Sequence, residues 1–196
     1  TQIVEFSKKL DPQNSSIQRD EAQALLECLW VLEEQRLPDL NLLKRVFKAK
    51  DGRVRAASIR TLGHWSGMIE GWETVLMIAA RDPSALVRAE AVKAAVELGG
   101  LSGAEAVFAA NTKELDPELV TVLNYAKSQL NIEQMIRQLL ETGRSLSPGA
   151  LAYVLATGKP DDLVRLEPSE EVYRAILSHV DSKIGMMQTS VSSLAE

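Results

Sequence analysis

Apolar residues recur along this chain at intervals of three and four positions, which is the spacing of one face of an α-helix. For example, Val87, Ala91 and Ala94 share one face of a helix. The polar positions of this helix remain for solvent or a partner: Arg88, Glu90, Lys93 and Glu97. No run alternates apolar and polar residues with the period of two that a half-buried strand requires. The sequence therefore predicts an all-α protein.

The flanking residues of these periodic segments predict short helices joined by short connections. Proline suits the first turn of a helix because its φ is fixed and it lacks an amide hydrogen, and Asp116-Pro117 and Ser147-Pro148 mark two such starts. Gly99-Gly100 marks a stop. The predicted helices span residues 20–34, 39–49, 53–66, 71–80, 85–98, 102–111, 117–129, 131–142, 148–157, 161–166 and 169–180. Residues 182–196 are expected to form one more amphipathic helix.

Two segments of the chain repeat each other. Residues 51–62 read DGRVRAASIRTL, and residues 82–95 read DPSALVRAEAVKAA. Aligning Val54 with Val87 gives a period of 87 − 54 = 33 residues, and a weaker third copy begins at Asp116. A period of this length is typical of stacked helical pairs, each of which buries its apolar face against its neighbours.

The second copy resembles the second helix of a HEAT repeat. It matches the pattern D-x(4)-V-R-x-x-A-x-x-A through Asp82, Val87, Arg88, Ala91 and Ala94. The resemblance implies an α-α superhelix, a HEAT- or armadillo-like solenoid of about five helical pairs. We expect a single domain over residues 1–196, excised from a larger multidomain protein because the chain lacks an initiator methionine. At the helix entrance, the Asp82 carboxylate is expected to accept amide hydrogen bonds and to meet an arginine of the same or a neighbouring repeat.

A narrower resemblance covers most of the chain. The segments ALLECLWVLEEQ, LLKRVFKAKDGRVRAASIRTLGHW, ARDPSALVRAEAVKAAVE, PGALAYVL and EEVYRAIL are similar to the helical region of planctomycete-type multidomain membrane-bound dehydrogenase and c-type haem-binding proteins. In that family a sugar-dehydrogenase-like propeller precedes HEAT-like repeats and a c-type haem domain follows. The resemblance implies a connecting role and an extracytoplasmic location, periplasmic or secreted. The haem attachment motif Cys-x-x-Cys-His is absent here, so neither haem binding nor dehydrogenase activity carries over.

Charge and composition exclude several partners. The 22 basic and 27 acidic residues give a net charge of −5, which removes the broad positive field that nucleic-acid binding depends on. No apolar stretch approaches the roughly 20 residues needed to cross a bilayer. We therefore expect no nucleic-acid partner and no membrane insertion by this chain. Cys28 is the only cysteine, so an internal disulfide or a multi-cysteine zinc site cannot form.

The candidate catalytic groups do not converge in the sequence. His64 and His179 are the only histidines, and neither has a second ligand at a convincing metal-binding spacing. His64 is better interpreted as a capping or partly exposed residue beside Trp65, and Cys28 as a buried, inert thiol. We predict no catalytic residue, no cofactor and no metal site.

The tryptophans fit a packing role better than a ligand-stacking role. Trp30, Trp65 and Trp72 each fall within or beside a predicted helix, where a large ring fills the space between helix layers.

The leading functional hypothesis is a non-catalytic scaffold that holds a protein segment or a neighbouring domain of the same polypeptide. Five basic residues of the second helices are the candidate partner-binding residues: Arg53, Arg55, Arg60, Arg88 and Lys93. Arginine suits a carboxylate-bearing partner because its planar fork can bind both oxygens, but internal Asp and Glu pairs could occupy the same row. The alternatives are a HEAT-like enzyme, of the DNA glycosylase or bilin lyase type, and a purely structural spacer.

Overall fold

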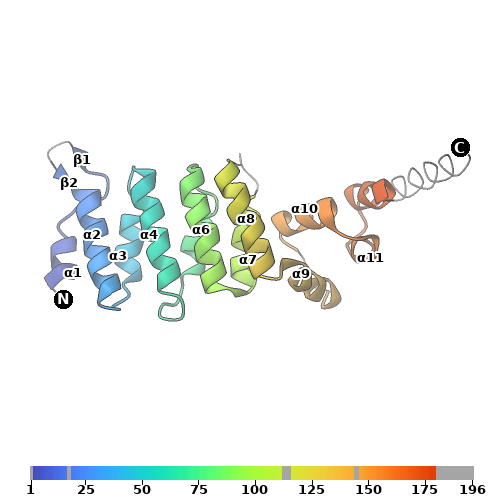
Figure 1. Ribbon diagram of the computed structural model, residues 1–196, viewed down its shortest axis with the longest axis horizontal. Coiled ribbons are helices and arrows are strands. Elements are labelled where there is room, and N and C mark those ends of the chain that lie inside the picture. Colours follow the sequence, from blue (N-terminus) through green and yellow to red (C-terminus); the bar gives the residue numbers. More distant parts are fainter. Residues whose placement is uncertain (1, 17–18, 112–115, 144–145, 180–196) are drawn as a thin grey trace, which may run out of the picture. The chain divides into compact units, whose positions relative to one another are not determined.

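The computed structural model describes residues 2–16, 19–111, 116–143 and 146–179 (Figure 1). The described residues are mostly helical, which confirms the all-α prediction. The chain divides into two compact units, Thr1–Ile132 and Glu133–Glu196, and each is described by itself. The expectation of a single domain over residues 1–196 stays a prediction. None of the described helices is long and apolar enough to cross a membrane.

The first unit contains eight described helices and one short pair of strands. In chain order these are α1 (Gln2–Ser7), β1 (Ser15–Ser16), β2 (Arg19–Asp20), α2 (Glu21–Glu34), α3 (Leu40–Val46), α4 (Gly52–His64), α5 (Glu73–Ala79), α6 (Ala85–Leu98), α7 (Gly100–Ala110) and α8 (Pro117–Gln129). The two strands pair antiparallel over two residues each. Neither α1 nor this pair was expected from the sequence.

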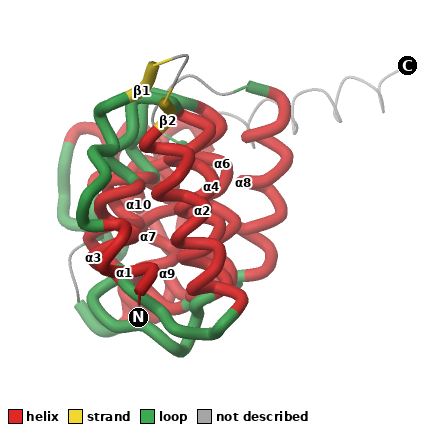
Figure 2. The backbone as a smooth tube through the Cα atoms, turned by 90° about the vertical axis from the view of Figure 1, so that its left-hand side faces the viewer, coloured by secondary structure: helices red, strands yellow, loops and turns green. Residues whose placement is uncertain are grey.

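The helices of the first unit lie in two rows. One row contains α2, α4, α6 and α8, in which each helix contacts the next (Figure 1). The second row contains α3, α5 and α7, which pack against the first row (Figure 2). The first-row helices begin at residues 21, 52, 85 and 117, so successive starts are 52 − 21 = 31, 85 − 52 = 33 and 117 − 85 = 32 residues apart. The arrangement therefore repeats with a period close to that found in the sequence.

Apolar side chains between the rows form the core of the first unit. The largest fully buried ones include Leu25, Leu29, Leu43, Ile59 and Leu76. They come from α2, α3, α4 and α5, at positions that the three- and four-residue spacing places on one face of each helix. Burial of these side chains is the main favourable term that holds the rows together.

Aspartates at the helix entrances fix where the first-row helices begin. Asp20, Asp51 and Asp116 each accept a hydrogen bond from a backbone amide in the first turn of α2, α4 and α8. An amide at this position has no partner within the helix, so the carboxylate satisfies it. Gly99, at φ 69°, separates α6 from α7 in the left-handed conformation that favours glycine.

Most helix boundaries agree with the sequence prediction within two residues. The expected spans 85–98, 117–129 and 148–157 match α6, α8 and α10 (Pro148–Thr157) at both ends. The main exceptions are two helices that end three residues early: α3 ends at Val46, and α11 is confined to Pro160–Leu163.

The second unit is smaller and also helical. It contains most of α9 (Ile132–Glu141), then α10 and α11, and residues 170–179 are helical as well. Its buried side chains include Ile136, Ala150, Val154, Leu163 and Val172. The helix expected at 182–196 lies outside the described residues.

Candidate functional site

The candidate site is a groove across α4, α6 and α8 with a volume of about 380 Å³. All three helices belong to the first row, so the groove lies on the face where three successive repeats meet. Its lining combines charged, aromatic and small residues: Arg60, Gly63 and His64 from α4, Glu90, Lys93, Ala94, Val96 and Glu97 from α6, and Tyr125 from α8. The volume is near the lower end for ligand pockets, which suits a few side chains of a partner.

The floor of the groove is the point of close approach between α4 and α6. A Cβ atom added to Gly63 would lie 3.1 Å from the Cα atom of Ala94, closer than ordinary van der Waals contact. Glycine on one helix and alanine on the other therefore allow this approach. Larger residues here would separate the helices and reshape the groove.

Glu90 binds two cations at one end of the groove. Arg60 donates to it through Nε (3.3 Å) and Nη2 (3.0 Å), and Lys93 donates through Nζ (3.1 Å). Glu90 is 3% exposed, whereas the side chains of Arg60 and Lys93 are 59% and 47% exposed. Burial alone would raise the pKa of Glu90, but the hydrogen bonds from both cations outweigh it and hold that pKa below its ordinary value. The groove therefore presents two cationic groups around one buried carboxylate.

The opposite end of the groove lies one helical turn further on. There His64 Nδ1 is 2.5 Å from Glu33 Oε1, and Thr61 donates to Glu33 Oε2 at 2.6 Å. Ser66 donates to the backbone carbonyl of Glu97 at 2.7 Å. These contacts connect α2 to α4 and α4 to α6, so they fix the position of successive helices in the row.

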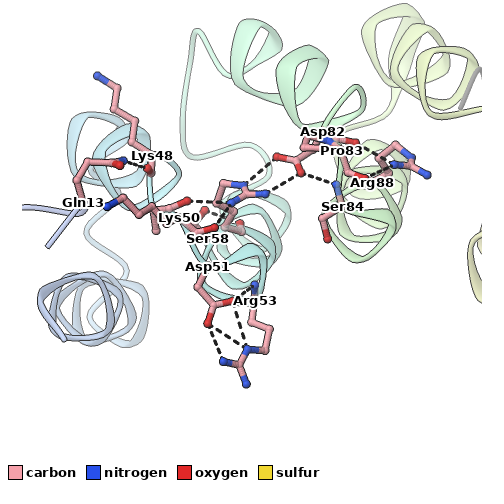
Figure 3. Close-up of polar contacts among 12 residues, drawn as sticks. Gln13, Lys48, Lys50, Asp51, Arg53, Ser58, Asp82, Pro83, Ser84 and Arg88 are labelled. Carbon is pink, nitrogen blue, oxygen red and sulfur yellow. Dashed lines mark hydrogen bonds and ion pairs between the residues drawn. The ribbon is translucent and has the colours of Figure 1, made fainter. Parts of the chain in front are cut away.

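A second polar cluster lies at the N-terminal ends of α4 and α6 (Figure 3). Arg55 donates through Nε and Nη2 to the two carboxylate oxygens of Asp82, both at 2.9 Å. The amide of Ser84 donates to Asp82 Oδ1 at 2.8 Å, next to the start of α6. The expectation that Asp82 would accept an amide bond and meet an arginine of a neighbouring repeat is confirmed.

Arg55 and Arg88 make equivalent backbone contacts in successive repeats. Arg55 Nη1 donates to the carbonyls of Ala49 and Lys50, which are six and five positions before it. Arg88 Nη1 donates to the carbonyls of Asp82 and Pro83, again six and five positions before it. The 33-residue period of the sequence therefore reappears in the hydrogen bonds.

The five predicted partner-binding residues separate into three groups. Arg60 and Lys93 share Glu90 in the groove. Arg55 and Arg88 lie at the helix entrances, where they donate hydrogen bonds to the carboxylate and to the backbone carbonyl of Asp82, respectively. Arg53 is 84% exposed and pairs with Asp51 on its own helix. The role of all five in partner binding stays a prediction, but the structure brings only two of them together in a groove.

The expectation that four polar residues of α6 remain for solvent or a partner is confirmed for Lys93 and Glu97, which are exposed, and wrong for Arg88 and Glu90. Arg88 is 2% exposed, and Glu90 is buried beneath Arg60 and Lys93. The reason is the position of α6, which has α4 on one side and α8 on the other and also contacts α5 and α7. A helix surrounded in this way buries polar positions that an isolated amphipathic helix would expose.

Three of the single residues considered in the sequence lie where it suggested: Cys28, Trp65 and His64. Cys28 is buried, and this burial raises the pKa of its thiol. Of the three tryptophans expected to pack between helix layers, Trp65 is fully buried in the core, Trp72 is half-buried and Trp30 is 41% exposed. His64 is partly exposed at the last residue of α4. Among the described residues, no group of three or more His, Cys, Asp or Glu side chains could hold a metal ion.

The sequence did not single out Gly63 or Tyr125 as site residues. Gly63 could have been found from the repeat alignment, because its equivalent in the next repeat is 63 + 33 = 96, and Gly63 and Val96 both line the groove. Tyr125 had no such signal, since only the packing of α8 against α6 brings it there.

A scan against models of known protein families finds no match, and a search of curated proteins finds none either.

Proposed function

We propose that this chain is a HEAT-like α-solenoid that works as a non-catalytic scaffold and holds a protein segment or a neighbouring domain. The repeated backbone contacts of Arg55 and Arg88 support the solenoid, because they recur at the period of the helical pairs. In such arrays the face built from one helix of each pair is the usual binding surface.

The observation that carries the binding role is the groove across α4, α6 and α8. It draws its lining from three successive first-row helices, so its shape depends on the stacking of repeats. Its exposed arginine and its tyrosine are side chains that commonly anchor protein partners.

The narrower sequence resemblance supports a second part of the proposal. In this view the module connects a propeller dehydrogenase-like domain to a c-type haem domain in an extracytoplasmic protein. Reading the coding sequence on either side of this chain tests it: a propeller upstream and a Cys-x-x-Cys-His motif downstream are expected. Flanking sequence with neither feature would reject the connecting role and leave the scaffold role standing.

A groove-filling variant tests the binding role directly. Val96 is half-buried in the lining, so Val96→Trp should occupy the groove without changing the charges around it. We expect short peptides selected from a random display library on the unaltered protein to lose binding to Val96→Trp. Thermal melting checks that the variant stays folded. A selection in which every recovered peptide binds both proteins equally would reject the groove as the binding site.

A further inference from the structure

The charges in the groove are not evenly distributed. Around Glu90, the guanidinium of Arg60 and the ammonium of Lys93 reach solvent while the carboxylate between them is buried. Two positive groups against one negative group leave this end of the groove net positive. Glu97 is exposed one turn further along α6, and the Glu33 carboxylate contacts His64 at this end, so the other end carries two negative groups.

The groove also has an apolar wall. Tyr125 of α8 is 58% exposed and lines the groove with Ala94 and Val96 of α6. An exposed tyrosine ring costs little conformational entropy when a partner covers it, and its face suits an aliphatic or aromatic side chain.

We propose that the occupant of the groove is a short protein segment with one carboxylate, from Asp or Glu, next to an apolar or aromatic residue. This inference rests on the proposed binding role. The carboxylate lies over Arg60 and Lys93, which are already held in place by Glu90 and so lose little freedom on binding. The neighbouring apolar side chain packs on Tyr125 and Val96.

Glu97 determines what the groove excludes. A second carboxylate placed one turn beyond the first would meet Glu97, and a chain of phosphates would do the same. Like charges opposed at an interface suppress such partners. The groove therefore favours a single acidic residue over a uniformly acidic peptide or a nucleic-acid strand.

Peptide selection followed by charge reversal tests this inference. Peptides that bind the unaltered chain but not Val96→Trp are sequenced, and their affinities are measured by fluorescence anisotropy. We expect one Asp or Glu beside an apolar residue in most of them. Lys93→Glu should weaken their binding about tenfold, because it replaces attraction by repulsion at the carboxylate. Lys44→Glu is the matched control, since Lys44 is exposed on α3 in the other row.

The outcomes separate the inference from the proposed function. Since Lys93→Glu places a second carboxylate near buried Glu90, Lys93→Gln provides a milder variant, with a smaller loss expected. Groove-dependent peptides that lack an acidic residue, or that bind Lys93→Glu more tightly, would overturn the inference and leave the binding role intact. Groove-dependent binding of a single-stranded oligonucleotide would overturn it as well. If no peptide distinguishes the unaltered chain from Val96→Trp, the binding role itself fails.

Discussion

Arg55 on α4 binds the carboxylate of Asp82 through two parallel hydrogen bonds, each 2.9 Å long, across 27 positions of sequence. Both side chains are largely buried, and Asp82 also accepts the amide of Ser84 next to the start of α6. The pair therefore joins the entrance of one first-row helix to the entrance of the next. The paired hydrogen bonds also hold the pKa of Arg55 above its ordinary value, although burial acts in the opposite direction.

Arg55→Ala should destabilise the first unit by about 3 kcal/mol, because it leaves the buried Asp82 carboxylate without its cation. Urea unfolding followed by circular dichroism measures the change in free energy. Arg53→Ala is the matched control, since Arg53 is on the same helix but 84% exposed, and its unfolding curve should overlay that of the unaltered protein. Equal effects of the two substitutions would contradict the structural role of the Arg55–Asp82 pair.

The approach of α4 and α6 at Gly63 leads to a second prediction. Gly63→Ala should destabilise by about 1–2 kcal/mol, because the new methyl group meets the backbone of Ala94, which cannot move without shifting α6. Gly52→Ala is a suitable comparison. Its new Cβ would lie 3.2 Å from the hydroxyl of Ser84, a side chain that can rotate away. The melting temperature of Gly63→Ala should be lower than that of Gly52→Ala. The reverse order would show that α4 and α6 separate easily.

The helix positions could be predicted from sequence because each helix has its own periodic apolar face. The spans of α6 and α8 follow from that spacing, and Asp116-Pro117 marks the start of α8. A contact between Asp82 and an arginine of the same or a neighbouring repeat could also be predicted, because the 33-residue period places equivalent helix entrances beside one another. In the structure this arginine is Arg55 of the preceding repeat. Both are properties of local sequence and of its repetition.

The surroundings of a side chain could not be predicted in the same way. Arg88 and Glu90 sit on the polar side of α6 in a helical projection, yet neighbouring helices cover both. Tyr125 enters the groove only because α8 packs against α6. The groove is thus a product of contacts between repeats, which the pattern within one repeat does not contain.

The ion pairs of Glu90 make the stability of the first unit depend on pH. The folded-state pKa of Glu90 is held below its ordinary value, so its contribution is fully present above the unfolded pKa of about 4.3 and is lost as pH falls through the folded pKa. Glu90→Gln should therefore be less stable than the unaltered protein at neutral pH, by about 1 kcal/mol because both cations are half exposed.

Unfolding curves at a series of pH values test the dependence. The difference between the unaltered protein and Glu90→Gln should shrink as pH falls below about 4. If the difference in the free energy of unfolding between the two proteins stays constant to the lowest pH at which both still fold, the charge of the Glu90 carboxylate contributes nothing to stability. Glu27→Gln provides a control, since Glu27 is exposed on α2.

The buried thiol of Cys28 provides a direct test of how tightly α2 is packed. Burial raises the pKa of this thiol, and a thiol reagent attacks only the thiolate that water can reach. Labelling of Cys28 in the folded protein should therefore be at least about tenfold slower than labelling of the denatured chain. The reference for an accessible thiol is Lys44→Cys in a Cys28→Ser background, because position 44 is exposed on α3. Fast labelling of Cys28 without denaturant, at the rate of the Lys44→Cys reference, would show that α2 opens readily and that its contacts with α3 and α4 are weak.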